Sequence, residues 1–494
     1  AQLASLSALS FGAAQIVAIS ELGVRAYTRW AAHTTLGQTQ TVLRPLVEEP
    51  GDGSTKVLDQ ARALSLFDAH NGLPGLPLDF DLLHYNVLLV LSEATRFDQT
   101  SLAEGGPRTT PKLAKFAKRG AFSFSRAYSP SSGTFQSVAG IFGMSYPSFL
   151  NLEIWQKAWQ GRFRDVGPTP AELFAQAGYE TFWIGHNKAS CFAQTVLGFD
   201  RGFRTTKLLS KEESGRPTAD ALIAKAAMRE LRGLSGDKKF FGWVFFDSPH
   251  SGYEKHYPKM PAKRALDLYR QEVRYMDEQL GKLLRELDKL GRLEDTIVIY
   301  SADHGEEFRD HGGRYHKATV YTEVTHVPLV IWVPGMKGQV LARPTSNAYV
   351  LPWLFQRGSP AMRSASMHRL RRDVGPMLER TSGAVVTELL GPDRMLTSLI
   401  YDTRKFNYDF HSRLHQAFRI DRDPKEQRDL FERDAALSKQ AIERMSAYRA
   451  VRGDRHAFKL RPDKKDPRIR TDALSDSRAE AGLARPRPRS GAGI

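Results

Sequence analysis

The side chains best suited to chemistry lie in one stretch, YSADHGEEFRDHGGRYHK, from Tyr300 to Lys317. Its apolar start ends in Asp303 and His304, and further carboxylates and imidazoles follow at once. Both kinds of group bind divalent metal ions, and both transfer protons. The stretch therefore predicts one wall of a reactive site. The simpler alternative is a turn at the end of a strand, with Asp303 capping a helix.

Polar residues also follow two other apolar runs of strand length. Glu93 follows NVLLVLS and precedes Arg96, while His250 follows FFGWVFFDSP. The carboxyl ends of parallel strands meet at one edge of a sheet, so we expect these residues to approach Asp303 and His304. Carboxylate oxygens combined with an imidazole nitrogen favour Zn²⁺ or Mn²⁺ over Mg²⁺ or Ca²⁺.

A hydroxyl group could supply the other half of the site. Thr134 lies in SPSSGTFQSVAG, where a short helix is expected to begin. The free N–H groups at a helix N-terminus favour a bound anion, and a metal ion lowers the pKa of a nearby hydroxyl. Thr134 is thus a candidate nucleophile, with Ser131, Ser132 and Ser137 as rivals. The alternative is that it only caps the helix.

Alternating strands and helices must position these residues. Continuous apolar runs predict strands at 86–92, 238–246, 295–301 and 327–335. Helical spacing predicts helices at 111–120 and 266–291, and residues 169–185 read as a helix followed by a strand. This order indicates an α/β fold with a mostly parallel central sheet flanked by helices.

Composition changes divide the chain of 494 residues. The predicted segments are the end of a transmembrane region (1–30), a connector (31–84), the core (85–340), a small α+β extension (341–452) and a disordered basic tail (453–494). The net charge of +16 suits anionic partners. The sequence lacks zinc-finger spacing and an RNP-like aromatic pattern, so nucleic acid is not expected as a partner.

The ordered set of motifs resembles the alkaline phosphatase/sulfatase superfamily. NVLLVLSEATRFD, SPSSGTFQSVAGIFGMSYP, FFGWVFFDSPHSGY, TIVIYSADHGEEFRDHG and THVPLVIWVPG appear in the family order. The resemblance covers roughly residues 85–340, and DPKEQRDLFE extends it. It is strongest to bacterial envelope phosphotransferases, namely lipoteichoic acid synthases and phosphoethanolamine transferases.

This resemblance implies an alkaline-phosphatase-like fold and a role for each matching residue. The implied metal ligands are Glu93, Thr134, Asp303 and His304, the implied catalytic residues are Thr134, His250 and His316, and the implied substrate-binding residues are Arg96 and Lys317. Ala94 follows Glu93 where many relatives have a second aspartate, which implies one metal ion. The formylglycine motif C/S-x-P-x-R is absent at residues 134–138, so phosphate esters are expected rather than sulfate esters.

The resulting expectation is a phospholipid head-group phosphotransferase. It would act on an anionic phospholipid or glycolipid at the bacterial inner membrane, with its catalytic domain facing the periplasm or the outside. Two alternatives stay open. One is a non-catalytic regulator, because parts of the sequence also resemble a sulfatase-like inner-membrane protein that senses lipopolysaccharide. The other is a soluble phosphatase or phosphonate-type hydrolase. His186 is expected to be structural. For His311, a functional role and simple exposure to solvent are equally expected.

Overall fold

The computed structural model describes most of the chain from residue 57 onward. The described ranges are 57–453 and 459–461, with gaps at 71–72, 74–79, 151, 156–160, 164–166, 187–197, 211–212, 214–216, 237 and 392–393. The predicted membrane segment 1–30 and the first half of the connector lie outside these residues. None of the described helices is long and apolar enough to span a bilayer.

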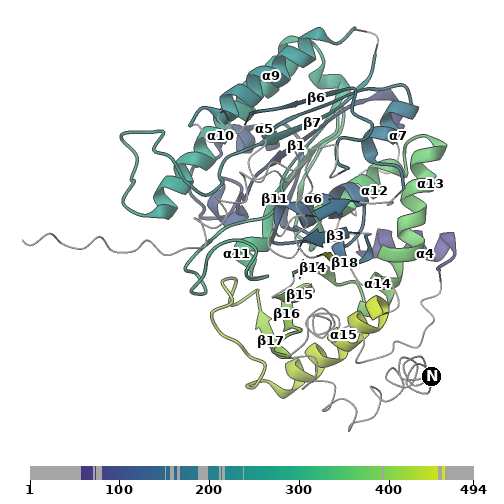
Figure 1. Ribbon diagram of the computed structural model, residues 1–494, viewed down its shortest axis with the longest axis vertical. Helices are drawn as coiled ribbons and strands as arrows, with labels where there is room; N and C mark the ends of the chain where they lie inside the picture. The colour runs from purple at the N-terminus through teal and green to yellow at the C-terminus, as the bar shows by residue number, and fades with distance from the viewer. Residues whose placement is uncertain are drawn as a thin grey trace, which may run out of the picture.

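A large, mixed β-sheet forms the centre of the fold (Figure 1). Its strands run in the order β12-β2-β11-β8-β1-β7-β5-β6, and β13 also pairs with β2. The five strands from β8 to β6 are parallel, whereas β11 is antiparallel to both β8 and β2. The bounds are β1 Asn86–Ser92, β2 Phe122–Tyr128, β5 Glu180–Gly185, β6 Thr205–Leu208, β7 Phe240–Phe246, β8 Thr296–Ala302, β11 His326–Trp332, β12 Val340–Leu341 and β13 Thr345–Ser346. The predicted mostly parallel sheet is confirmed.

Helices cover both faces of this sheet (Figure 1). One face packs against α5 (Pro111–Ala117), α9 (Ala219–Gly233) and α10 (Ala265–Lys289). The other packs against α4 (Gln60–His70), α6 (Thr134–Gly143), α7 (Pro170–Gln176), α12 (Val350–Phe355), α13 (Pro360–Arg369) and α14 (Gly375–Thr381). Successive side chains of a strand point to opposite faces, so Leu88 joins the first core and Leu89 the second. Burial on both faces explains why these strands are continuous apolar runs.

A smaller antiparallel sheet forms the C-terminal part, at the bottom of Figure 1. Its strands are β14 (Val385–Leu390), β15 (Met395–Ile400), β16 (Arg404–Asp409) and β17 (Leu414–Arg419), and helix α15 (Ala435–Gly453) follows. The predicted small α+β extension is confirmed.

A further, three-stranded sheet has the order β18-β3-β4. Its strands are β3 (Leu152–Trp155), β4 (Gly161–Phe163) and β18 (Lys459–Arg461). Strand β18 therefore lies within the segment predicted to be a disordered tail. Gly453 ends α15, and the other residues of that tail lie outside the described part of the chain.

Candidate active site

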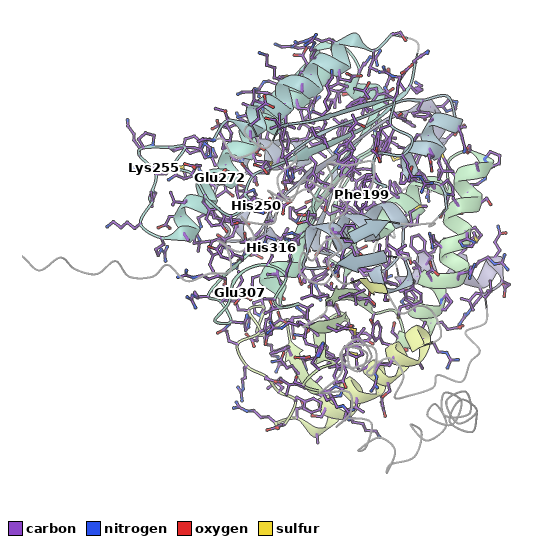
Figure 2. The ribbon with its side chains drawn as sticks, in the orientation of Figure 1. Phe199, His250, Lys255, Glu272, Glu307 and His316 are labelled. Carbon is purple, nitrogen blue, oxygen red and sulfur yellow. The ribbon has the colours of Figure 1, made fainter. Side chains whose placement is uncertain are left out.

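The candidate residues gather at the carboxyl edge of the parallel strands. Glu93 directly follows β1, and Asp303 and His304 directly follow the neighbouring strand β8. Strand β7, on the other side of β1, leads to His250. His250 and His316 lie next to each other in Figure 2, and their ring centroids are 5.8 Å apart. The approach of these side chains at one edge of the sheet is thus what the strand order predicts.

Thr134 is at the centre of this group. Its Oγ1 lies 3.0 Å from Glu93 Oε1 and 3.0 Å from His304 Nε2. His304 Nε2 is also 3.3 Å from Glu93 Oε1 and 3.3 Å from Asp303 Oδ2. One hydroxyl, two carboxylates and one imidazole from three separate segments therefore converge on a small, buried volume.

These residues fit a divalent metal ion. Ligand atoms of Glu93, His304 and His316 lie within 4.8 Å of one another. Asp303 Oδ2 is buried and makes no hydrogen bond among the described residues, and its one ion pair there is the 3.3 Å contact with His304, so a divalent cation would satisfy it further. Oxygen and imidazole donors in this number suit a single transition-metal ion. The predicted ligands are Glu93, Thr134, Asp303 and His304, and the structure places His316 within reach of two of them.

Electrostatics also favour a cation here. Burial and the nearby Glu93 raise the pKa of Asp303 to about 8. Burial opposes a charge on His304, but Asp303 and the hydrogen bond with Glu93 outweigh it and raise the pKa of His304 to about 9. Burial likewise opposes a charge on Glu93, yet contact with His304 holds the pKa of Glu93 well below its ordinary value. The carboxylates of Glu93 and Asp303 both interact with the single proton on His304 Nε2. A divalent cation would neutralise both carboxylates at once.

The helix that carries Thr134 begins where the nucleophile hypothesis requires. Gly133 is the N-cap of α6, so Thr134 is its first residue and lies among free backbone N–H groups. Two rival hydroxyls are engaged elsewhere, because Ser137 Oγ donates to the Asp303 carbonyl and Ser131 Oγ contacts Gln136 Oε1. The third rival, Ser132, is buried without a side-chain hydrogen bond in the described residues. Of these hydroxyls, Thr134 is the one in contact with Glu93 and His304.

Lys317 reaches the start of the same helix. Its backbone N–H donates to the Ser132 carbonyl at 3.0 Å, with a φ of +63°. A Cβ on Gly133 would lie 3.0 Å from Lys317 Cγ, so glycine leaves room for this side chain. The position fits the substrate-binding role that the resemblance implies for Lys317, which stays a prediction.

Arg96 is held by ion pairs within the protein. Its guanidinium lies 2.9 Å from Asp98 Oδ2 and 3.0 Å from Asp310 Oδ2, and it also donates to the Glu306 carbonyl. The side chain is buried, and these carboxylates raise its pKa despite the opposing effect of burial. Arg96 therefore ties the loop after β1 to the loop after β8, and contact with substrate stays a prediction.

Glu306 and Tyr253 hold His316 in place. Glu306 Oε1 lies 2.9 Å from His316 Nδ1, and Tyr253 donates to Glu306 Oε2 at 2.7 Å. Burial raises the pKa of Glu306 to about 7. Burial and the neighbouring His304 lower the pKa of His316 well below its ordinary value. His316 is thus oriented by a carboxylate that the sequence did not single out.

His186 lies closer to the site than expected for a purely structural residue. It follows β5 and is buried, with Nε2 3.7 Å from Glu93 Oε2 and Nδ1 3.3 Å from Asp247 Oδ1. Asp247 follows β7 in the same way. The rule that identified Glu93, a polar residue directly after a buried parallel strand, would have identified both.

A comparison with known families matches the Sulfatase family model to residues 85–357. The chain belongs to the sulfatase family. The match covers more than half of the chain and includes every candidate site residue. The predicted resemblance to the alkaline phosphatase/sulfatase superfamily is confirmed.

Individual relatives come from several branches. Iduronate 2-sulfatase from Homo sapiens is 35% identical over 86 residues, which is 17% of this chain and 15% of that protein. Inner membrane protein YejM from Salmonella typhimurium is 23% identical over 286 residues, covering 56% of this chain and 43% of that protein. The matches thus span less than half the length of these relatives.

A solved structure supports the fold. The phosphonate monoester hydrolase of Agrobacterium radiobacter superposes with a TM-score of 0.58 and 18% identity. The superposition covers 74% of this chain and 96% of that one. At this identity the likeness confirms the alkaline-phosphatase-like fold.

Proposed function

We propose that this protein is a metal-dependent enzyme that uses Thr134 to cleave or transfer phosphate esters. The observation that carries the proposal is the position of Thr134 Oγ1, 3.0 Å from both Glu93 and His304 at the start of α6. Sulfate esters are the less favoured substrates, because residues 134–138 lack the formylglycine motif. Iduronate 2-sulfatase and the phosphonate monoester hydrolase support an ester-cleaving role.

The cofactor of this proposal is one divalent metal ion, Zn²⁺ or Mn²⁺ in preference to Mg²⁺ or Ca²⁺. Glu93, Asp303, His304 and Thr134 would hold it, with His316 within reach. Bound there, the ion would lower the pKa of the Thr134 hydroxyl and stabilise negative charge on the phosphoryl group.

The residues then divide the reaction into two steps. Thr134 Oγ1 forms a bond to phosphorus, its proton passes to Glu93 Oε1 in hydrogen-bond contact, and the bond from phosphorus to the leaving group breaks. His250, which is only half-buried and lies beside His316, donates a proton to the leaving oxygen. Water or an acceptor hydroxyl then forms a bond to phosphorus and gives its proton to His250. The bond from phosphorus to Thr134 Oγ1 breaks, and Oγ1 takes back its proton from Glu93. The N–H groups at the start of α6 and Lys317 bind the phosphoryl oxygens.

We further propose an anionic phospholipid or glycolipid as the substrate. The protein would act at the bacterial inner membrane, with this domain on the periplasmic or outer side. The net charge of +16 supports an anionic partner, and the similarity to Inner membrane protein YejM supports the location. The same similarity favours a second candidate function, that of a membrane regulator without turnover.

A trapping experiment tests the nucleophile. Purified protein is loaded with Mn²⁺ or Zn²⁺, incubated with bis(p-nitrophenyl) phosphate or with vesicles containing phosphatidylglycerol, and quenched in acid for peptide mass spectrometry. We expect a phosphoryl group on Thr134 that keeps its second substituent, p-nitrophenyl from the first substrate or glycerol from the second. Turnover should fall at least roughly 10³-fold in Thr134→Ala. Thr169→Ala, which removes the N-cap of the distant helix α7, is the matched control. Full turnover in Thr134→Ala would refute the assignment, and metal uptake without turnover on any ester would favour the regulator.

A further inference from the structure

The connection between β8 and β11, residues 303–325, carries half of the candidate site but has little structure of its own. It contains two-residue strands, β9 (Glu307–Phe308) and β10 (Arg314–Tyr315), and one helical turn, α11 (Thr322–Thr325). A segment so poor in regular structure depends on outside contacts for its shape. Those contacts therefore decide how precisely the metal ligands are placed.

The first contact fixes the turn directly after the metal ligands. Gly305 N–H donates to the Val324 carbonyl and Glu306 N–H to the Glu323 carbonyl, both at 3.0 Å. A Cβ on Gly305 would lie 2.1 Å from the Glu323 oxygen, so only glycine permits this approach. The main chain at Glu323 thus supports His304 on one side and, through Glu306, the imidazole of His316 on the other.

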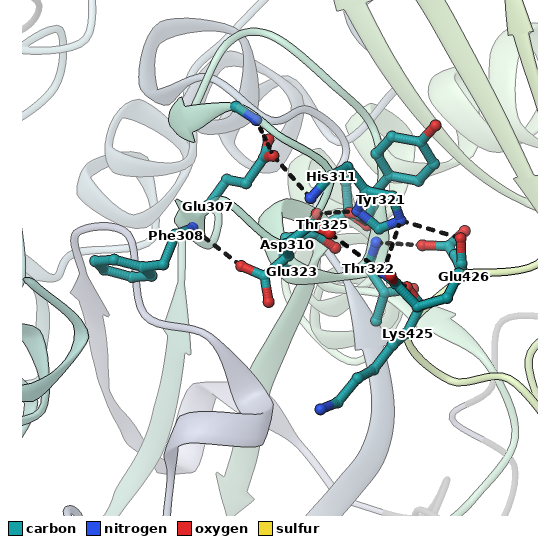
Figure 3. A network of polar contacts seen from close by, with 12 residues as sticks. Glu307, Phe308, Asp310, His311, Tyr321, Thr322, Glu323, Thr325, Lys425 and Glu426 are labelled. Atoms are coloured by element: carbon teal, nitrogen blue, oxygen red, sulfur yellow. Dashed lines mark hydrogen bonds and ion pairs between the residues drawn. The ribbon is translucent and has the colours of Figure 1, made fainter. Parts of the chain in front are cut away.

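The second contact extends from Glu323 to His311 (Figure 3). Glu323 Oε1 lies 2.6 Å from His311 Nδ1. The ring of His311 stacks on Tyr321 at 3.6 Å with an interplanar angle of 8°, and its Nε2 lies 3.0 Å from the Glu426 carbonyl. His311 therefore joins the middle of the connection to its C-terminal end and to the segment that follows β17.

The third contact is a buried ion pair from the C-terminal sheet. Lys405, on β16, places Nζ 2.9 Å from Glu426 Oε1, and both side chains are fully buried. Glu426 Oε2 also accepts from the Thr322 N–H at 2.5 Å (Figure 3). Glu426 has a φ of +53°, an unfavourable conformation for glutamate that the surrounding bonds must maintain. Three polar contacts and the peptide bond between Thr322 and Glu323 therefore close a ring through Glu426, Thr322, Glu323 and His311, and Lys405 anchors it.

We infer that the Lys405–Glu426 pair is a positioning device for the active site. A buried ion pair contributes little net stability compared with apolar side chains of similar size, but it fixes geometry, because each charge demands its partner. Here it connects the C-terminal sheet to the one segment that carries Asp303, His304, His316 and Lys317. The C-terminal sheet thus helps to position the residues of the site. The inference rests on the proposed metal site, but on neither the nucleophile nor the substrate.

Two variants separate positioning from stability. Lys405→Met leaves Glu426 buried without its cation, whereas Lys405→Met/Glu426→Leu removes both charges and keeps an apolar filling. Arg369→Met is the matched control. Arg369 ends helix α13, and the substitution breaks a comparable ion pair with Asp373, 3.1 Å away. Two properties are measured. One is the affinity for Mn²⁺ and Zn²⁺ by chelator competition, and the other is the hydrogen exchange of metal-free protein, peptide by peptide.

The double variant decides the question. We expect it to fold, to bind metal about tenfold or more weakly, and to exchange faster at residues 303–325 with β1 and β7 unchanged. Wild-type affinity and exchange in the folded double variant would overturn the inference. So would unfolding of both variants while Arg369→Met folds, because the pair would then serve the whole fold. If wild-type protein takes up no metal, the proposed function fails, and hydrogen exchange alone still decides this inference.

Discussion

Replacing His311 should destabilise the protein at neutral pH but not at high pH. Burial opposes a charge on His311, yet the contact with Glu323 and the nearby Glu426 outweigh it and raise its pKa from the ordinary 6.5 to about 9. A pKa raised by folding stabilises the folded state below the unfolded pKa, and this stabilisation is lost as pH rises through the folded pKa. The contribution is therefore complete below pH 6.5 and fades through pH 9.

The expected magnitude follows from the size of that change. A pKa difference from 6.5 to about 9 corresponds to about 3 kcal/mol, at about 1.4 kcal/mol per pKa unit. Because the ion pair keeps partial access to water, we lower this to about 1–2 kcal/mol. His311→Gln removes the titrating group and keeps a polar side chain of similar length.

The assay is urea unfolding of wild-type and variant protein in EDTA at pH 6.0 and pH 9.5. His311→Gln should lose about 1–2 kcal/mol of unfolding free energy at pH 6.0, and the loss should shrink toward zero at pH 9.5. Burial lowers the pKa of His326 to about 4, so this residue is neutral at both pH values and His326→Gln should show no such change. An equal loss at both pH values for His311→Gln would refute the ion pair.

Three further substitutions test neighbouring parts of the site. Gly305→Ala should lower the unfolding free energy by about 1–3 kcal/mol, because its Cβ would overlap the Glu323 carbonyl. Gly233→Ala, which has open space around it, should leave the unfolding free energy unchanged. Urea unfolding of both variants tests this. His186→Gln should weaken metal binding about tenfold in chelator competition, since the imidazole faces Glu93 Oε2, and unchanged affinity would leave His186 a packing residue. Arg96→Met should lower the free energy of unfolding, measured by thermal unfolding, by about 1–3 kcal/mol, because Asp98 and Asp310 lose their ion-pair partner. A higher KM with unchanged stability would instead support the predicted contact with substrate.

The parallel part of the fold could be predicted because its strands are buried on both faces. The runs at 86–92 and 295–301 match β1 and β8 within one residue at each end. Their carboxyl ends then placed Glu93, Asp303 and His304 at one edge without further information. The antiparallel pairing of β2 with β11 was not predicted, because β2 alternates apolar and polar residues and carries no signal of its partner.

The rest of the site depends on contacts between residues far apart in sequence. The 303–325 connection has no periodicity, so neither the approach of His316 to Glu93 nor the support from Lys405 could be read from local pattern. Glu306 and Glu323 look like ordinary surface acids in sequence, and only the folded chain buries them. The prediction was therefore best where the backbone pattern was regular.

We propose that Glu93, Thr134, Asp303 and His304 hold a divalent metal ion, and the rest of the proposed chemistry depends on this ion. Elemental mass spectrometry of purified wild-type protein and Asp303→Ala, before and after supplementation with Zn²⁺ or Mn²⁺, tests it most directly. We expect close to one ion per wild-type chain and a loss of that ion in the variant. Absence of metal from both proteins after supplementation, or equal content in both, would contradict it.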